Sequence, residues 1–403
     1  MKADPRFMSD ELPQLTNLGF DVETPDIPIP EVRESSSVVA DTIDTAFKLA
    51  FIGSGQGGSR LAQSFHELGY ARVCALNSTA QDMQAITLPE THKLVVGHGG
   101  AGKNPQQAAD WFAQSKEDVL DFMRRCFGSV FDRIIVCAGA GGGTGAGTVL
   151  PLVQTAHDLQ QALKCSTDKV GVILALPKNS EGKKVNENAY FVLEKLLAQV
   201  SPIGPISPLI LLDNERIHNI FPGLAIDQFW GTANRSIASL FNLFNTITTK
   251  NSTYTTFDPN DWRSILDSGV IVFGATAIKQ WGDATHISHA IRDNLKRNIL
   301  SGGLDLSTGT VAAGVIIAGR SVLREVPAEY LDHAYEQLTR LLKRNSTVHR
   351  GIYSGSQETM VAYTAVGGLG QPTAKLEELR RLGDVLLNQK PDVGTVMGES
   401  SRT

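Results

Sequence analysis

Residues 138–148 read Ala-Gly-Ala-Gly-Gly-Gly-Thr-Gly-Ala-Gly-Thr, and they connect two apolar segments. The segment before them, residues 133–138, is rich in β-branched residues, and the segment after them, residues 149–163, can be helical. Because glycine has no Cβ atom, several backbone N–H groups can converge in such a loop without clashes. At a helix N-terminus these donors and the helix dipole favour a bound anion, usually a phosphate. The strand–loop–helix context therefore predicts a phosphate-binding loop rather than a flexible linker.

From residue 47 onward, short apolar segments alternate with amphipathic ones. The apolar segments predict strands at residues 47–52, 72–77, 93–96, 133–138, 170–176 and 208–213. The others predict helices near residues 59–69, 104–127, 146–163 and 184–200. This alternation indicates an α/β fold with a parallel sheet that is covered on both faces. Gly-rich segments at residues 53–58, 97–102 and 139–147 each follow a strand, so we expect them to meet at the ligand-binding edge of the sheet.

The second half of the chain begins with a long amphipathic segment. Its apolar residues recur at three- and four-residue steps and predict a helix over residues 227–248, about 30 Å long at 1.5 Å per residue. Such a helix could lie against two domains at once. A second domain follows, with strands predicted at 270–278, 310–317 and 359–366 and helices near 285–299 and 327–345. A last helix carries Leu376, Leu379, Leu382 and Leu386 on one face.

Composition limits the classes of protein that fit. The chain has 403 residues, of which 42% are hydrophobic, and a net charge of −5, which argues against a dedicated nucleic-acid surface. Four cysteines show no C-x-x-C spacing and favour a reduced, cytoplasmic setting. No apolar stretch reaches 18 residues, so we expect neither a membrane span nor export. Residues 1–46 hold ten acidic residues against three basic ones and predict an extended or disordered arm.

Two of the Gly-rich segments match better-known motifs incompletely. Residues 53–58 satisfy G-x-G-x-x-G, but the next strand ends at Asn77, where an NAD site would need an acidic residue for the ribose. Residues 97–104 nearly satisfy the P-loop motif, but Asn104 stands where a Ser or Thr hydroxyl should bind magnesium. Several phosphate loops around one polyphosphate suit a nucleoside triphosphate better than a dinucleotide. An NAD(P)-dependent oxidoreductase built on residues 53–58 remains the alternative from another class.

The Gly-rich run at residues 138–148 resembles the G-G-G-T-G-[ST]-G signature of the tubulin/FtsZ superfamily of filament-forming GTPases. The resemblance is ordered along residues 47–370. It implies a Rossmann-like parallel-sheet GTPase domain and a smaller α+β domain joined by a long central helix. The domains expected are an acidic Pro/Ser-rich arm, a GTP-binding domain, the central helix, a C-terminal activation domain, a C-terminal helix and a disordered tail, at residues 1–46, 47–225, 226–250, 251–370, 371–390 and 391–403.

The same resemblance implies a site for GTP or GDP with Mg²⁺, and it assigns no metal ligand within the chain. Glu181 matches the ribose-binding glutamate, while Asn214 and Asn234 match the two positions that contact guanine. An Asn amide can meet both the acceptor and the donors of the guanine edge. Lys103 replaces a glycine that FtsZ proteins have there. The nucleotide-binding residues expected are Gly55, Gln56, Gly57, Gly58, Asn77, Ala101, Gly102, Lys103, Asn104, Gly141, Gly142, Gly143, Thr144, Gly145, Glu181, Asn214 and Asn234.

Residues 256–261, Thr-Phe-Asp-Pro-Asn-Asp, resemble the catalytic N-x-D-x-x-D loop of the family, with Thr256 in place of the asparagine. We call this segment the acidic loop. The resemblance implies that Asp258 and Asp261 enter the nucleotide pocket of the next subunit and orient the attacking water there. Taken alone, either aspartate is also a plausible N-cap for a helix that starts beside Trp262.

Three stretches resemble the TubZ branch of plasmid and phage proteins, namely residues 176–189, 211–214 and 257–262. This branch implies head-to-tail self-assembly and segregation of DNA through a small DNA-binding adaptor, TubR, without direct sequence-specific DNA contact or a membrane. We expect Lys375, Arg380 and Arg381 to be the adaptor-facing candidates, although a solvated helix face would look the same. The chain shows no apolar-acidic terminal peptide of the kind expected in a division-type FtsZ, which remains the alternative within the family.

Overall fold

A computed structural model describes residues 40–220, 225–296, 303–356 and 359–385. Most of the predicted acidic arm, the predicted tail at 391–403, Leu386 and the end of the helix predicted at 285–299 lie outside these residues. The division into domains stays a prediction.

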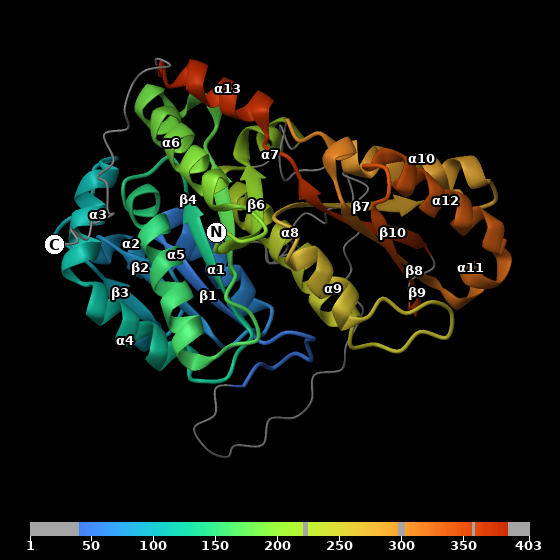
Figure 1. Cartoon of the computed structure of the whole chain (residues 1–403), viewed down its shortest axis with the longest axis horizontal. Helices are drawn as coiled ribbons and strands as arrows, with labels where there is room; N and C mark the ends of the chain where they lie inside the picture. Colours follow the sequence, from blue (N-terminus) through green and yellow to red (C-terminus); the bar gives the residue numbers. More distant parts are fainter. Residues whose placement is uncertain (1–39, 221–224, 297–302, 357–358, 386–403) are drawn as a thin grey trace, which may run out of the picture.

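A single ten-stranded sheet runs through the molecule in the order β3-β2-β1-β4-β5-β6-β7-β10-β8-β9 (Figure 1). The six strands of its first half are all parallel to their neighbours. In the second half, β10 is antiparallel to β7 and β8, while β9 is parallel to β8. The strands are β1 (Leu49–Ser54), β2 (Val73–Asn77), β3 (Lys93–Val95), β4 (Arg133–Gly139), β5 (Val170–Leu176), β6 (Ile206–Asp213), β7 (Val270–Ile278), β8 (Val311–Gly319), β9 (Thr347–Gly355) and β10 (Met360–Leu369).

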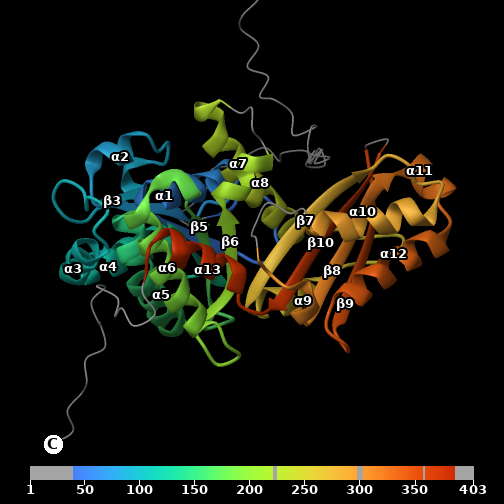
Figure 2. The same cartoon turned by 90° about the horizontal axis from the view of Figure 1, so that it is seen from above.

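The helices lie on both faces of this sheet, as the alternating pattern predicts (Figure 2). α1 and α8 pack together on one face, whereas α5 packs between α3 and α6 on the other. The helices are α1 (Gly55–Glu67), α2 (Ala80–Gln84), α3 (Pro105–Gln114), α4 (Lys116–Phe127), α5 (Thr144–Leu163), α6 (Lys183–Gln199), α7 (Asn214–Ile220), α8 (Ile226–Ile247), α9 (Pro259–Leu266), α10 (Ala284–Lys296), α11 (Arg320–Glu325), α12 (Ala328–Leu341) and α13 (Thr373–Leu382). Short 3₁₀ turns are η3 (Glu90–His92), η4 (Asn179–Glu181) and η5 (Leu306–Thr308).

Three expectations about secondary structure were wrong in detail. The helix predicted at 104–127 is two helices, because Ser115 leaves the helical region and both ends α3 and precedes α4. Strand β9 was missed, since its sequence is polar and its side chains are mostly half-buried or exposed at the sheet edge. The short helices α2, α7 and α11 were also missed, because five to seven residues are too few to show a helical period.

An aromatic cluster around Phe241 joins the two halves of the sheet. Phe241 lies on α8 and is fully buried. Its ring centroid lies 5.8 Å from that of Phe65 on α1, 5.6 Å from that of Trp262 on α9 and 6.2 Å from that of Phe273 on β7. Edge-to-face pairs of this kind add to the free energy gained by burying the rings. The central helix is therefore fixed to both halves by one side chain.

We predict that Phe241→Ala lowers the free energy of unfolding by about 3–5 kcal/mol, because the substitution leaves a cavity among the rings of Phe51, Phe65, Trp262 and Phe273. Urea denaturation followed by circular dichroism measures this loss. Tyr254→Ala is the control, since Tyr254 is half exposed and its loss should change stability by less than about 0.5 kcal/mol. A loss below about 1 kcal/mol at Phe241 would show that the cluster does not join the two halves.

Candidate functional site

A pocket lined by the Gly-rich loops lies where the strand order reverses. β1 is flanked by β2 on one side and β4 on the other. The connections that follow β1 and β4 therefore run to opposite faces of the sheet and leave a crevice at the carboxyl ends of these strands. The crevice has a volume of about 400 Å³. All but three of the nucleotide-binding residues expected from the sequence line it: Gly55, Gln56, Gly57, Asn77, Ala101, Gly102, Gly141, Gly142, Gly143, Thr144, Gly145, Glu181, Asn214 and Asn234.

Two glycines let the first and third Gly-rich loops touch. Gly55 has a φ of +67°, and a Cβ atom there would lie 2.9 Å from the backbone N of Gly145. At Gly145 a Cβ atom would lie 2.6 Å from the carbonyl oxygen of Gly139 in the same loop and 3.2 Å from that of Ser54 at the start of the first loop. Any side chain at these positions would push the two loops apart. The contact places the N-terminus of α5, which has no side-chain cap, at the floor of the pocket, where its N–H groups can bind an anion.

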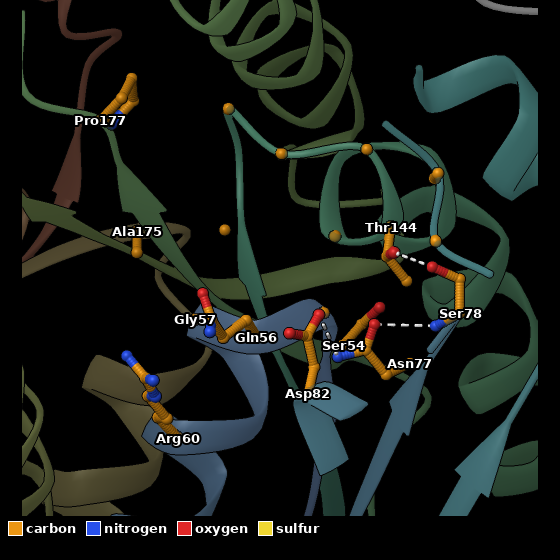
Figure 3. A pocket seen from close by; sticks show the side chains of 18 of the residues that line it. Ser54, Gln56, Gly57, Arg60, Asn77, Ser78, Asp82, Thr144, Ala175 and Pro177 are labelled. Atoms are coloured by element: carbon orange, nitrogen blue, oxygen red, sulfur yellow. Dashed lines mark hydrogen bonds between the residues drawn. The ribbon is translucent and has the colours of Figure 1, made fainter. Parts of the chain in front are cut away.

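A row of polar side chains closes one wall of the pocket (Figure 3). The hydroxyl oxygens of Ser78 and Thr144 lie 2.7 Å apart. The side chain of Asn77 accepts a hydrogen bond from the Ser78 backbone N at 2.8 Å and donates one to Asp82 at 3.4 Å. Thr144 is therefore held by Ser78, directly after β2, and Asn77 by Ser78 and by Asp82 on α2 before any ligand binds. Asp82 is a carboxylate that the sequence did not suggest for the site.

The far end of the pocket carries two nearly buried amides. Asn214 begins α7 directly after β6, and Asn234 lies on α8 next to Trp230, one turn away. Asn214 is 5% exposed, and its Oδ1 atom has no hydrogen-bond partner among the described residues. A buried amide oxygen without a partner costs about 1–3 kcal/mol, so a ligand that donates a hydrogen bond there gains that energy back. The far end of the pocket is therefore suited to a ligand with N–H donors.

Helix α13 closes a ring of polar contacts behind this end. The Nζ atom of Lys375 lies 3.1 Å from Asp213 Oδ1 and 2.9 Å from Glu378 Oε2. Asn179 donates from its side chain to Glu378 at 2.8 Å and from its backbone to Glu215 at 2.9 Å. Asp213 in turn accepts the backbone N–H of Glu215 at 3.2 Å and so caps α7. The ring fixes the start of α7, where Asn214 lies.

Lys375 is therefore not the adaptor-facing residue that the sequence suggested. It is buried, and although burial by itself lowers the pKa of a lysine, the carboxylates of Asp213 and Glu378 raise the pKa of Lys375 above its usual value. The spacing of the leucines predicted an apolar face for α13, but it did not indicate whether the Lys375 side chain would be buried or exposed. Arg381 remains exposed, and Arg380 pairs with Glu377 on the same helix.

Three expected residues do not line the pocket. Gly58 packs under the loops, where a Cβ atom would lie 2.2 Å from the Cys137 carbonyl oxygen. Asn104 caps α3 by accepting the backbone N–H groups of Gln106 and Gln107. Lys103 has a φ of +62°, and its carbonyl oxygen accepts a hydrogen bond from Asn188 at 3.0 Å. Asn188 also donates to Gly141, so it ties the second Gly-rich loop to the third.

Several pocket residues were missed from the sequence: Ser54, Arg60, Ser78, Thr79, Asp82, Gly100, Gly139, Ala175, Pro177 and Trp230. Ser78 and Thr79 directly follow the last residue of β2, so the rule that ligands bind at carboxyl ends of strands could have found them. Arg60 lies about one turn after Gly57 on α1. The spacing of residues along this helix gave no reason to expect Arg60, rather than another surface residue, in the pocket.

Asp258 and Asp261 form a capping box at the start of α9. Asp258 Oδ1 accepts the backbone N–H groups of Asn260 at 2.7 Å and Asp261 at 3.0 Å. Asp261 Oδ2 accepts the backbone N–H of Asp258 at 3.1 Å. Capping and catalysis are compatible here, because both amides bind the same oxygen of Asp258 and the exposed residue retains Oδ2 for another donor.

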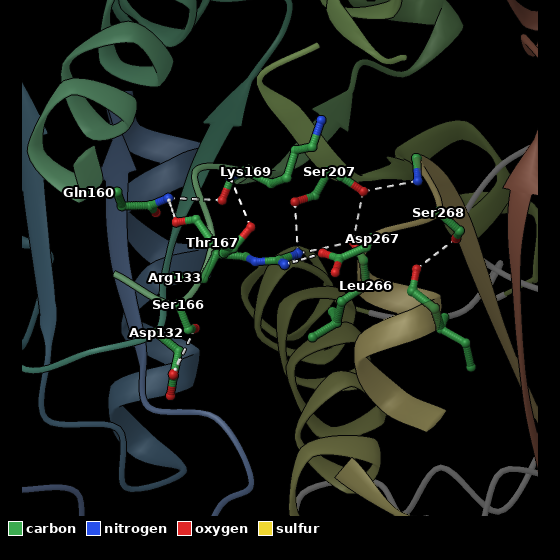
Figure 4. Close-up of polar contacts among 12 residues, drawn as sticks. Asp132, Arg133, Gln160, Ser166, Thr167, Lys169, Ser207, Leu266, Asp267 and Ser268 are labelled. Carbon is green, nitrogen blue, oxygen red and sulfur yellow. Dashed lines mark hydrogen bonds and ion pairs between the residues drawn. The ribbon is translucent and has the colours of Figure 1, made fainter. Parts of the chain in front are cut away.

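The other end of α9 is anchored at the sheet edge opposite the pocket (Figure 4). The guanidinium of Arg133 donates to the carbonyl oxygens of Ser207 at 2.9 Å and Leu266 at 3.0 Å and pairs with Asp267. Arg133 begins β4, whereas Gly139 ends it at the pocket, about 20 Å away at 3.3 Å per residue. Burial lowers the pKa of Arg133, and Asp267 opposes that effect. The C-terminal end of α9 thus lies where β4 begins, whereas the pocket lies where β4 ends.

We predict that Arg133→Met lowers the free energy of unfolding by about 2–3 kcal/mol, because the Ser207 carbonyl oxygen loses its side-chain donor and Asp267 loses its ion pair. The Leu266 carbonyl oxygen keeps the Ser207 hydroxyl as a donor. Urea denaturation measures the loss, and Arg340→Ala serves as the control. Arg340 makes only an exposed pair with Glu336 one turn away, which is worth at most about 0.5 kcal/mol. Equal stabilities of the two variants would contradict an anchoring role for Arg133.

Within the described residues, no helix is both long and apolar enough to cross a membrane. The same residues contain no group of three or more His, Cys, Asp or Glu side chains placed to hold a metal ion.

Comparison with known proteins identifies the fold of both halves. The model of the tubulin/FtsZ family GTPase domain matches residues 48–222, and the model of the TubZ-like C-terminal domain matches residues 243–375. Tubulin-like protein TubZ of Bacillus cereus is 23% identical over 254 residues, which are 58% of this chain and 56% of that protein. The match therefore spans little more than half the length of this curated relative.

Two solved structures share the fold over most of their length. The GTPγS-form protofilament of Bacillus thuringiensis serovar israelensis TubZ superposes with a TM-score of 0.74 at 20% identity, covering 85% of this chain and 92% of that one. A structure described as type III plasmid segregation TubZ gives a TM-score of 0.70 at 19% identity, with 85% and 93% covered. The chain belongs to the tubulin/FtsZ family and carries a TubZ-like C-terminal domain.

Proposed function

We propose that this protein binds and hydrolyses GTP, assembles head to tail into filaments, and uses them to segregate or position plasmid or phage DNA through an adaptor. The observation that carries the nucleotide part is the pocket at the reversal of strand order. It combines a helix N-terminus and Gly-rich loops at one end with the unpartnered Oδ1 of Asn214 at the other. A nucleoside triphosphate has its phosphates at one end and its base at the other, so it matches these two groups of binding residues.

The amides favour guanine as the base. Guanine presents N–H donors at N1 and N2, and Asn214 offers a buried acceptor to which no described residue donates. Asn234 lines the same end and supplies a second amide. Adenine lacks N–H donors at these two positions, so it would leave the Asn214 oxygen unsatisfied at a cost of about 1–3 kcal/mol. Glu181 lies on the same pocket, where it could accept hydrogen bonds from ribose hydroxyls.

The donor set also fits Mg²⁺ bound largely by phosphates. Mg²⁺ usually keeps several waters and takes one or two protein carboxylates together with substrate phosphates. Asp82 is the carboxylate beside Asn77 and the Gly-rich loops, and it would hold the ion in this way. Bound Mg²⁺ would neutralise charge on the phosphates.

Hydrolysis would need two subunits. The acidic loop leads into α9, whose other end is fixed beside Arg133, at the edge of the sheet opposite the pocket. Head-to-tail stacking would bring Asp258 and Asp261 of one subunit to the pocket of the next, where they would orient the attacking water. The TubZ structures that share this fold include a protofilament, which supports the same arrangement here.

The DNA-related part rests on the TubZ-like C-terminal domain and on the likeness to a plasmid-segregation TubZ. DNA contact would be indirect and would pass through a small TubR-like adaptor, since the net charge is −5. Exposed Arg381 is the adaptor-facing candidate that α13 retains. All four cysteines are free thiols, which supports a reduced, cytoplasmic setting.

We predict that Asn214→Ala weakens GTP binding about tenfold to a hundredfold, because the buried acceptor for guanine is lost. Titration calorimetry with GTPγS measures the affinity, and ATPγS binding should not change. Asn242→Ala is a matched control, since Asn242 is also buried, its Oδ1 has no donor in the described parts of the chain, and it does not line the pocket. Equal effects at both positions would rule out guanine recognition by Asn214.

We predict that Asp258→Asn and Asp258→Ala both form polymer with GTP but release phosphate at least about a hundredfold more slowly than wild type. Asparagine keeps the helix cap, so the comparison separates capping from charge. High-speed sedimentation and phosphate release measure both properties, with GTP, ATP and NADH in separate reactions.

A wild-type rate in Asp258→Asn would mean that Asp258 only caps α9. Asp305→Asn, which alters the cap of η5 outside the acidic loop, should behave like wild type. Binding of NADH without any GTP-dependent polymer would favour the alternative hypothesis, an NAD(P)-dependent oxidoreductase.

A further inference from the structure

Strand β9 supports the acidic loop through several contacts. The hydroxyl of Tyr353 accepts the backbone N–H of Phe257 at 2.9 Å and donates to its carbonyl oxygen at 3.1 Å. The backbone N–H of Ile352 donates to the carbonyl oxygen of Thr255 at 2.9 Å. β9 is the edge strand beside β8, so these contacts attach the loop to a part of the sheet that is distant in sequence.

A histidine on the same strand contacts one of the two aspartates directly. The Nδ1 atom of His349 lies 2.7 Å from Asp261 Oδ1, and its Nε2 atom lies 2.9 Å from Ser264 Oγ. The Ser264 hydroxyl donates its one hydrogen to the backbone carbonyl of Asp261 at 2.7 Å. The imidazole is therefore held between the first and second turns of α9. Its side chain is 17% exposed, and that of Asp261 is 24% exposed.

These contacts fix the orientation of the Asp261 carboxylate. An ionised carboxylate only accepts hydrogen bonds, so Nδ1 of His349 must carry the proton that it shares with Oδ1. The other oxygen, Oδ2, accepts the backbone N–H of Asp258. The two oxygens thus have one donor each, from β9 and from the loop itself. Without the imidazole, the carboxylate could turn about its Cβ–Cγ bond while keeping the backbone contact.

The serine does not make this a nucleophilic triad. Ser264 lies one turn after Asp261 on the same helix, and its hydroxyl is directed to a carbonyl oxygen of that helix. Its contacts hold the ring in place instead.

We propose that His349 is a positioning residue for GTP hydrolysis: it holds the Asp261 carboxylate in the orientation needed at the pocket of the next subunit. This inference rests on the proposed function, in which the acidic loop acts on the neighbour's GTP. His349 itself touches neither nucleotide nor water in this role. Its effect reaches the reaction through Asp261.

Three substitutions at one position test the contact. His349→Asn retains an amide N–H close to the place of Nδ1, whereas His349→Gln places its amide near Nε2, and His349→Ala removes both. In full-length protein with saturating GTP, we expect alanine and glutamine to slow phosphate release per polymerised subunit about tenfold or more. Asparagine should stay within about threefold of wild type. GTP affinity and the concentration needed for assembly should be the same in all four proteins.

His333→Ala is the matched control, because His333 is an exposed histidine on α12 in the same half of the chain. Thermal unfolding of each variant checks that the fold is intact. Wild-type hydrolysis in His349→Ala, or equal loss in the asparagine and glutamine variants, would overturn the positioning role while leaving the proposed function intact. Absence of GTP hydrolysis in wild type itself would overturn both.

Discussion

The packing of α8 against the sheet is the interaction on which the other parts of the molecule depend. Its N-terminal half carries Asn234 to the pocket, and its C-terminal end leads toward the acidic loop. Between them, Phe241 contacts rings from α1, α9 and β7. Near the end of the helix, the Asn245 side chain accepts the backbone N–H of Phe47 at 3.1 Å and donates to its carbonyl oxygen at 2.9 Å. The separation of the two functional ends is therefore set by one rigid element.

A second constraint acts at each end of that element. At the pocket, Gly55 and Gly145 allow two loops to touch, which no other residue type permits without displacing them. At the acidic loop, Arg133 and His349 hold α9 from the sheet at its last and first turns respectively. Both ends are thus fixed by side chains of the sheet and its loops rather than by α8 alone. This arrangement suits a subunit that stacks head to tail, because the pocket of one copy must then fit the acidic loop of the next.

The parallel sheet and the end of it where the Gly-rich loops meet could be predicted, because both follow from local sequence pattern. That Asn214 and Asn234 line the same pocket could be predicted from the order of the family's motifs along the chain. It did not predict the places of Asn104 and Lys375, since a cap and a buried ion pair leave no periodic signal. His349 was missed for a related reason. It lies in polar β9, 88 residues after Asp261, and the two come together through the pairing of β9 with β8 and the hydrogen bonds from β9 to the acidic loop.

The ring closed by Lys375 also has a consequence for biosynthesis. Every residue that lines the pocket precedes residue 235, whereas Lys375 and Glu378 belong to the last helix described. A ribosome that adds about 5–20 residues per second makes them roughly 7–28 s later. During that interval, the contacts of Lys375 with Asp213 and of Glu378 with Asn179 cannot form. A nascent chain can therefore bring the Gly-rich loops of the pocket together before α13 is present to brace the end that holds Asn214.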